Sequence, residues 1–243
     1  MDGKVILTMT TIPARIDTTL QWVIDALDNM RYDDYEIHLN IPAVYEKTGE
    51  KYVVPTWLKD YKRVKVYDGL EDMGPKTKII PTLLRCKGSD VIITVDDDII
   101  YKRNMISYHM MLRKKYPKAA TGFSGTKDGR LILTPRTDVE VDILDNYKSA
   151  SYCRWWFGPD FFRHYVNQSW NDDLVVSAYL RDSGIKKIVC TYNAETYFYP
   201  RVRSFPIVKL IDMPMTGCDL FRGHAFKSSS PELQVMYDAI QRT

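Results

Sequence analysis

The residues at 91–95, Val-Ile-Ile-Thr-Val, run directly into three consecutive aspartates, Asp96, Asp97 and Asp98. A nearly continuous apolar run of this length is typical of a strand that is buried on both faces, as the strands of parallel sheets are. Parallel sheets carry helices on their faces, so this segment favours an α/β fold. It also places three carboxylates where a buried strand ends.

The rest of the chain fits the same fold class. Up to about residue 116, strand-like and helix-like segments alternate, which predicts a mostly parallel sheet flanked by helices. The expected strands are 5–9, 35–41, 64–67 and 91–95, and the expected helices are 18–30, 75–84 and 104–116. Further on we expect strands at 131–133, 139–143 and 185–190 and helices at 172–182 and 231–241. Without repeats or a low-complexity linker, the sequence predicts one domain over 1–243, with a nucleotide-binding-like half (1–116) and a half that completes the site (117–243).

Composition excludes some classes of function. The chain has 34 Lys plus Arg against 31 Asp plus Glu, and the net charge of +3 gives no support for nucleic-acid binding. No stretch approaches about eighteen uninterrupted apolar residues, so we expect no transmembrane segment. The start of the chain lacks the long apolar region of a signal peptide, and the four cysteines are far apart. We therefore expect a reducing, cytoplasmic location.

The three aspartates are the strongest indication of chemistry. Adjacent carboxylates repel one another, and a divalent cation with hard oxygen ligands, Mn²⁺ or Mg²⁺, would resolve that repulsion. Ligands of open α/β sheets bind outside the carboxyl ends of the strands, which is where this cluster lies. In an extended segment Asp96 and Asp98 would point the same way and Asp97 elsewhere. The alternative is a charged surface turn without a ligand.

With three further segments, these aspartates carry a family resemblance. Thr8–Arg15 reads TMTTIPAR, Gly74–Lys78 reads GPKTK and Trp170–Leu174 reads WNDDL. Together they resemble the GT-A glycosyltransferases, in a family-2-like branch, over about residues 4–190. Within that branch the chain looks most like the glycosyltransferase domains that large algal viruses carry for building capsid glycans, which would place it in the host cytoplasm. The resemblance implies a Rossmann-like GT-A fold and a metal-dependent transfer of sugar from a nucleotide sugar to a glycan hydroxyl.

The resemblance also assigns the donor site. It implies that the first loop and Lys78 hold the base, ribose or diphosphate of a UDP-sugar, such as a UDP-hexose or UDP-rhamnose. Cationic side chains suit a diphosphate, although Arg15 and Lys78 could instead be exposed charges near a helix start and Lys76 an ordinary surface lysine. The residues assigned to donor binding are Thr10, Ile12, Arg15, Lys76, Lys78, Asp96 and Asp97. Asp98 and Asp96, with His224 from the C-terminal region, are assigned to the metal, and an ordinary surface histidine is the alternative for His224.

Asp172 and Asp173 are the candidate catalytic pair. Transfer of a sugar to a hydroxyl needs a base, and a carboxylate at a helix start in a cleft can serve as one. The family pattern favours Asp173 as the base of an inverting reaction, with Asp172 beside it. That pattern usually has Glu before Asp, so the assignment between the two stays open. Helix capping is the structural alternative.

Trp155 and Trp156 are the candidate acceptor side. An exposed indole is a good platform for the face of a sugar, while two core aromatics are the alternative. Three other functions remain: a Mg²⁺-dependent nucleotidyltransferase acting on sugar phosphates, a glycosidase with two carboxylates, and a non-catalytic carbohydrate-binding module. The motifs of dinucleotide, P-loop and HExxH zinc enzymes do not occur in the sequence.

Overall fold

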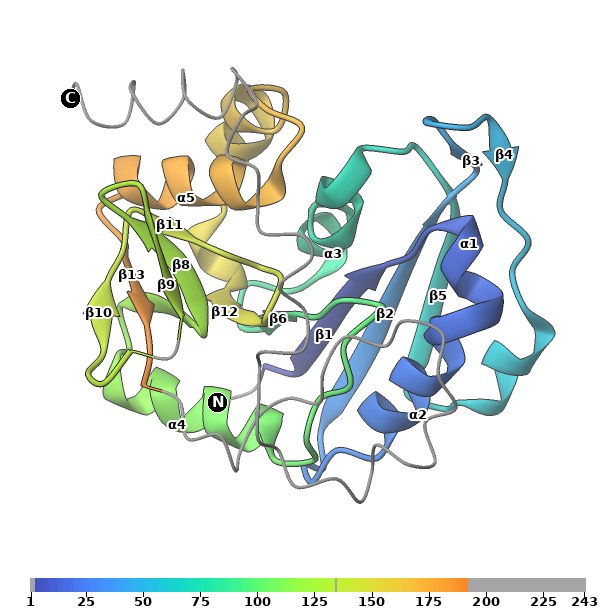
Figure 1. Ribbon diagram of the computed structural model, residues 1–243, viewed down its shortest axis with the longest axis horizontal. Coiled ribbons are helices and arrows are strands. Elements are labelled where there is room, and N and C mark those ends of the chain that lie inside the picture. The colour runs from blue at the N-terminus through green and yellow to red at the C-terminus, as the bar shows by residue number, and fades with distance from the viewer. Residues whose placement is uncertain (1–2, 134, 192–243) are drawn as a thin grey trace.

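The computed structural model describes residues 3–133 and 135–191, and an eight-stranded sheet runs through the middle of them (Figure 1). The strands lie side by side in the order β10-β13-β7-β12-β6-β1-β2-β5. Their bounds are β1 Val5–Thr10, β2 Tyr35–Pro42, β5 Val64–Leu70, β6 Val91–Thr94, β7 Ala119–Gly122, β10 Val139–Glu140, β12 Ala150–Cys153 and β13 Lys186–Val189.

One half of this sheet is entirely parallel. Strand β1 pairs in parallel with both β2 and β6, and β2 pairs in parallel with β5. The carboxyl ends of these four strands therefore meet at one edge. In the other half, β12 runs antiparallel between β6 and β7, and β10 runs antiparallel to β13. The predicted fold class, a mostly parallel sheet flanked by helices, is confirmed.

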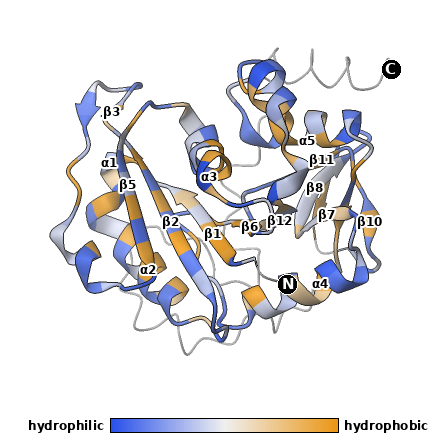
Figure 2. Cartoon of the chain, turned by 180° about the vertical axis from the view of Figure 1, so that it is seen from behind, coloured by the Kyte–Doolittle hydropathy of each residue, from blue (hydrophilic) through white to orange (hydrophobic). Residues whose placement is uncertain are grey.

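Helices cover both faces of the sheet, and successive residues of β1 face different layers. Val5 and Leu7 belong to the hydrophobic cluster that includes residues of α2 and α4, whereas Ile6 belongs to the cluster that includes residues of α3 and α5. Figure 2 shows the hydrophobic residues along β1 and β2 that form this core. The helices are α1 Pro13–Arg15, α2 Gln21–Asp28, α3 Ile80–Arg85, α4 Met105–Lys115 and α5 Asp172–Asp182. Shorter helical turns lie at Ile16–Leu20, Thr56–Asp60, Gly74–Lys78, Arg154–Trp156 and Phe161–Tyr165.

Two small sheets flank the central one. A hairpin of β3 (Val44–Tyr45) and β4 (Glu50–Lys51) follows β2. A three-stranded sheet combines β8 (Ser124–Lys127), β9 (Arg130–Leu133) and β11 (Ile143–Leu144). Among the described residues, none of the helices has both the length and the apolar character needed to cross a bilayer.

The structure differs from the sequence predictions at several elements. Strands β7, β8 and β12 were not predicted, because Ala, Ser, Thr and Gly dominate them and they are held by pairing with neighbouring strands. The predicted helix 75–84 is a tight turn followed by α3, and the predicted helix 18–30 belongs to helical structure that begins at Pro13. The predicted strand 139–143 is divided between β10 and β11. The predicted helix 231–241 lies outside the described residues.

Candidate active site

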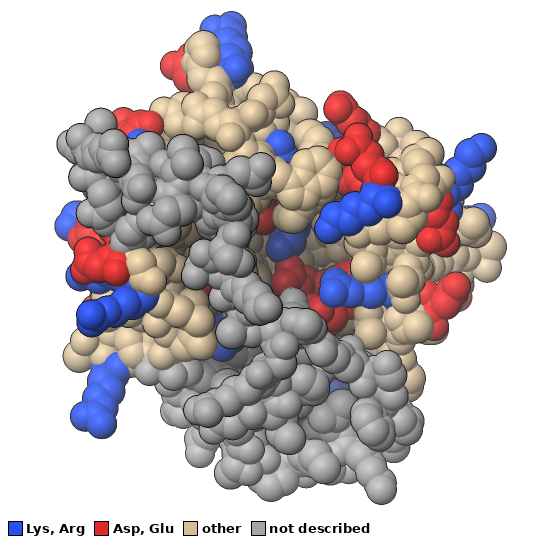
Figure 3. Space-filling view, turned by 45° about the horizontal axis from the view of Figure 1, so that its top comes forward, with Lys and Arg blue, Asp and Glu red and all other residues tan. Residues whose placement is uncertain are grey.

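A pocket of about 230 Å³ opens at the edge where the parallel strands end. The segments after β1, β2, β5 and β6 all contribute to its wall, as the topology of such sheets predicts. In the space-filling view, acidic and basic side chains meet in a hollow of this face (Figure 3). The lining residues are Thr10, Thr11, Ile12, Arg15, Tyr45, Lys47, Tyr52, Asp72, Gly74, Pro75, Lys78, Asp96, Asp97 and Trp170.

Arg15 binds two of the three aspartates that follow β6. One guanidinium nitrogen, Nη1, lies 2.6 Å from Asp97 Oδ1, and Nη2 lies 3.1 Å from Asp98 Oδ2. The Thr11 hydroxyl donates to Asp97 Oδ2 at 2.7 Å. Burial raises the pKa of Asp97 to about 6 in spite of the opposing effect of Arg15. The chain turns at Asp97 and Asp98, which share Arg15 as a partner, while Asp96 and Asp97 line the pocket and Asp98, expected beside Asp96, does not.

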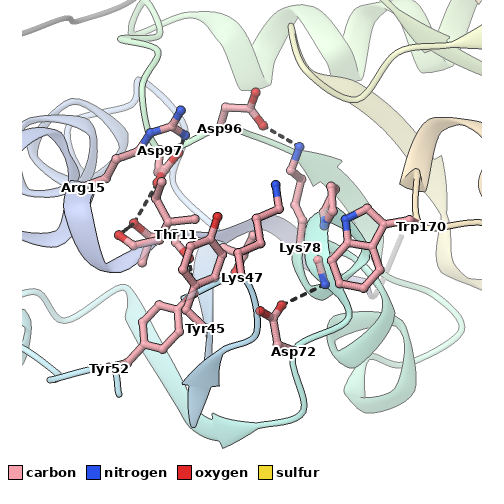
Figure 4. A pocket seen from close by; sticks show the side chains of 14 residues that line it. Thr11, Arg15, Tyr45, Lys47, Tyr52, Asp72, Lys78, Asp96, Asp97 and Trp170 are labelled. Carbon is pink, nitrogen blue, oxygen red and sulfur yellow. Dashed lines mark hydrogen bonds and ion pairs between the residues drawn. The ribbon is translucent and has the colours of Figure 1, made fainter. Parts of the chain in front are cut away.

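Lys78 binds the third aspartate. Its Nζ lies 2.5 Å from Asp96 Oδ1 (Figure 4). The same Nζ lies 3.8 Å from Asp172 Oδ2. Burial alone would lower the pKa of this ammonium group, but Asp96 and Asp172 hold it above its usual value. Lys78 is therefore a buried cation that lies between Asp96 and Asp172, the first residue of α5.

The carboxylates of this turn have the chemistry of a cation site. Asp96 and Asp97 line the pocket, and carboxylate oxygens are the protein ligands of Mg²⁺, which takes its remaining ligands from water and from substrate phosphates. Within residues 3–133 and 135–191, no three His, Cys, Asp or Glu side chains form a metal-binding group. Among the described residues, the aspartates of this turn are the ligands that such a site could use, and His224 lies outside the described residues.

Asp172 and Asp173 open α5, where the sequence predicts a helix start. The side chain of Asn171 caps the helix, accepting from the amides of Asp173 at 2.8 Å and Leu174 at 3.2 Å. The two acids point elsewhere: Asp172 Oδ2 accepts from Nδ2 of Asn146 at 3.0 Å, and Asp173 Oδ1 accepts from the Asn146 amide at 2.6 Å. Capping is therefore the role of Asn171, and the acid side chains are directed to the sheet.

Burial and neighbouring carboxylates raise the pKa of both acids. For Asp172 burial is the larger cause, opposed by Lys78. For Asp173 burial is reinforced by the carboxylates of Asp172 and Asp145, which raise its pKa well above the usual value. Such a carboxylate holds a proton more readily than an exposed one does.

Within the described part of the chain, six predicted site residues are not among those that line the pocket: Lys76, Asp98, Trp155, Trp156, Asp172 and Asp173. Lys76 is buried, and its Nζ donates to the carbonyl of Val166 at 2.6 Å. Trp155 and Trp156 follow β12, which runs antiparallel to β6, so they lie at the opposite edge of the sheet from the aspartates. Trp156 is buried in the core and Trp155 is 66% exposed. The direction of β12 thus places the two tryptophans away from the pocket, and the bond to the Val166 carbonyl turns Lys76 away from it.

Trp170, and neither Trp155 nor Trp156, is the tryptophan at the pocket. It lines the pocket, is 45% exposed and lies two residues before Asp172. Its indole packs directly on Gly74, where a Cβ atom would come within 2.2 Å of Cε2 and where φ is +60°. This contact explains why glycine is needed at that position.

The hairpin after β2 adds lining residues without a motif of their own. Tyr45 and Tyr52 meet edge to face, with ring centroids 6.4 Å apart, and the Tyr52 hydroxyl donates to the Thr11 carbonyl at 3.1 Å. Opposite them, Asp72 accepts from the amides of Gly74 at 2.8 Å and Glu46 at 3.0 Å. No motif in the sequence pointed to these residues, which the hairpin alone brings to the pocket.

No protein-family model and no curated protein matches the sequence. Solved structures do match. This fold resembles that of S. aureus TarS. The TarS 1-349 structure has a TM-score of 0.54 at 12% identity, with 81% of this chain and 60% of that chain covered. Its complex with UDP-GlcNAc gives 0.55 at 13% identity, covering 84% and 60%, and its complex with UDP gives 0.52 at 14%, covering 81% and 60%. TarS is a glycosyltransferase, and the chain spans about 60% of the length of these TarS structures. At these identities the likeness establishes the fold.

Proposed function

We propose that this protein is a glycosyltransferase that moves a sugar from a UDP-sugar to a hydroxyl group of a glycan. The observation that carries the proposal is the pairing of Arg15 and Lys78 with the acids of the 96–98 turn, in one pocket at the ends of parallel strands. The fold shared with the UDP-GlcNAc complex of TarS supports it.

The donor's diphosphate would lie between these charges. Arg15 and Lys78 each offer N–H donors to phosphate oxygens, and such charge-assisted bonds are among the strong ones. Mg²⁺ or Mn²⁺ held by aspartates of the 96–98 turn would supply further positive charge to the leaving diphosphate. Thr10, Thr11 and Ile12 line the same side and would contact the nucleoside.

The acid pair of α5 would supply the base. Asp172 lies next to Lys78 and Asp173 adjoins it, so either carboxylate can take the acceptor's proton as the new bond forms. Their raised pKa values suit that task, because a base works best when its pKa approaches the working pH. Attack from the face opposite the diphosphate would invert the configuration of the sugar.

The acceptor would approach past Trp170. Its indole is 45% exposed, lines the pocket and lies two residues before Asp172, so a sugar ring stacked on it would lie near the start of α5, where the acid pair is. For the donor sugar, the resemblance favours a hexose or a deoxyhexose such as rhamnose, and the TarS complex adds N-acetylglucosamine to the candidates. A role in viral capsid glycans in a host cytoplasm rests on the sequence resemblance alone.

A panel of nucleotide sugars tests the proposal. Release of nucleoside diphosphate is measured with Mn²⁺, with Mg²⁺ and with a chelator, and UDP binding is measured by calorimetry. We expect UDP release from at least one UDP-sugar and its loss in Lys78→Met. Lys186→Met is the matched control, since Lys186 is exposed on β13 and pairs with Glu140 at 2.8 Å. Pyrophosphate release from a nucleoside triphosphate and a sugar phosphate would instead indicate a nucleotidyltransferase, and sugar binding without turnover a binding module.

A further inference from the structure

Asn146 is a fully buried residue in the segment between β11 and β12. Its backbone amide donates to Asp173 and its side-chain Nδ2 donates to Asp172, so one residue binds both acids of α5. On its other side, Oδ1 accepts from the hydroxyls of Tyr152 at 2.7 Å and Thr94 at 3.3 Å. A buried amide with partners on both sides is held in one orientation.

These bonds close a ring that contains both parts of the proposed active site. Thr94 ends β6 and lies two residues before Asp96. Asp96 binds Lys78, Lys78 lies 3.8 Å from Asp172, and Asp172 binds Asn146, which returns to Thr94. The distance between Asp96 and the pair Asp172 and Asp173 is therefore fixed at two points. Lys78 holds it at the pocket, and Asn146 holds it on the buried side.

We propose that Asn146 is a positioning residue, which holds Asp172 and Asp173 at the distance and angle from the donor that sugar transfer requires. This inference rests on the proposed function. Asn146 is fully buried behind the two acids, so it acts through them and not on the substrate.

The chemistry of the position explains why an amide is needed there. Asp172 and Asp173 need donors, while Tyr152 and Thr94 need an acceptor. An aspartate at 146 would face both acids with a further negative charge, and a leucine would offer neither donor nor acceptor. The Nδ2 bond also lowers the pKa of Asp172, against the effect of burial. Besides Asp173, the charged groups near Asp172 are Lys78, Asp96 and Asp145.

The variants Asn146→Leu and Tyr152→Phe test the proposal. Asn146→Leu keeps the backbone amide bond to Asp173 and removes the side-chain bond to Asp172. We expect kcat to fall by about ten- to a hundredfold, as for loss of a hydrogen bond to a charged group, with the UDP dissociation constant and KM for the donor unchanged. Tyr152→Phe removes one bond to Oδ1, and we expect kcat to fall by about two- to tenfold. The Asp172 carboxyl carbon is followed by NMR titration, and its pKa should rise in Asn146→Leu.

Each outcome decides the question. Unchanged kcat in a folded Asn146→Leu protein overturns the proposal, and so does an equal loss of UDP affinity, which would make Asn146 part of the donor pocket's scaffold. If Asn146→Leu does not fold, Tyr152→Phe decides by the same two readouts. If the wild-type protein releases UDP from no nucleotide sugar, the proposed function fails separately. The NMR titration then judges Asn146 alone, and an unmoved Asp172 pKa refutes its positioning role.

Discussion

Lys78→Met should separate the electrostatic role of Lys78 from its packing role. Methionine fills a similar volume without the charge, so the change leaves Asp96 and Asp172 without their shared cation. The lysine and both carboxylates are largely buried, and removing one partner of a buried ion pair costs about 3–5 kcal/mol. For a domain of this size each kcal/mol corresponds to about 2–4 °C in Tm, so we expect a fall of about 6–20 °C.

The assay is thermal unfolding, by calorimetry or circular dichroism, of Lys78→Met, Asp96→Asn and the double variant. Because Asp96→Asn removes a carboxylate that the single variant leaves unpaired, the double variant should recover part of the lost stability. The control Lys186→Met removes an exposed pair and should change the free energy of unfolding by less than about 1 kcal/mol. A Lys78→Met protein that melts with the wild type would refute the claim that this ion pair is buried and strong.

Three further predictions address other parts of the site. Burial raises the pKa of Asp145 to about 6, above its ordinary value in the unfolded chain. Ionisation of Asp145 should therefore reduce the free energy of unfolding as pH rises from about 4 to 6. Asp145→Asn should melt at a higher temperature than the wild type at pH 7 but not at pH 4. Gly74→Ala should displace the Trp170 indole, which quenching of tryptophan fluorescence by acrylamide would reveal as a more accessible ring, and an unchanged quenching constant would contradict the packing described. Trp170→Ala should raise KM for the acceptor by about tenfold, and Trp155→Ala should leave it unchanged. Equal effects of the two substitutions in steady-state kinetics would refute the proposed place of the acceptor.

The position of the charged cluster at the ends of the parallel strands could be predicted from the sequence, because it depends on local pattern and on one topological rule. An apolar run followed by aspartates locates the end of β6, and parallel strands bring that end beside the loop that carries Arg15. The helix start at Asp172 was also readable, from polar residues directly before a helical pattern.

The remaining assignments depend on tertiary structure. Lys76 and Lys78 are two residues apart in one tight turn, and only packing decides that Lys78 faces the pocket while Lys76 binds the Val166 carbonyl. Trp155 was expected beside the site because no pattern in residues 119–153 indicates that β12 runs antiparallel to β6. Asn146 has no motif at all: its importance comes from a position between two strands and a helix that are far apart in the chain.

The hairpin of β3 and β4 supplies Tyr45, Lys47 and Tyr52 to the pocket from a short excursion that contributes no residue to the fully buried strands of the sheet. Its length and composition can therefore change with little effect on the framework that carries the charged groups. A family of proteins built on this plan could exchange the hairpin to accept different ligands and keep the same acids and cations beneath it.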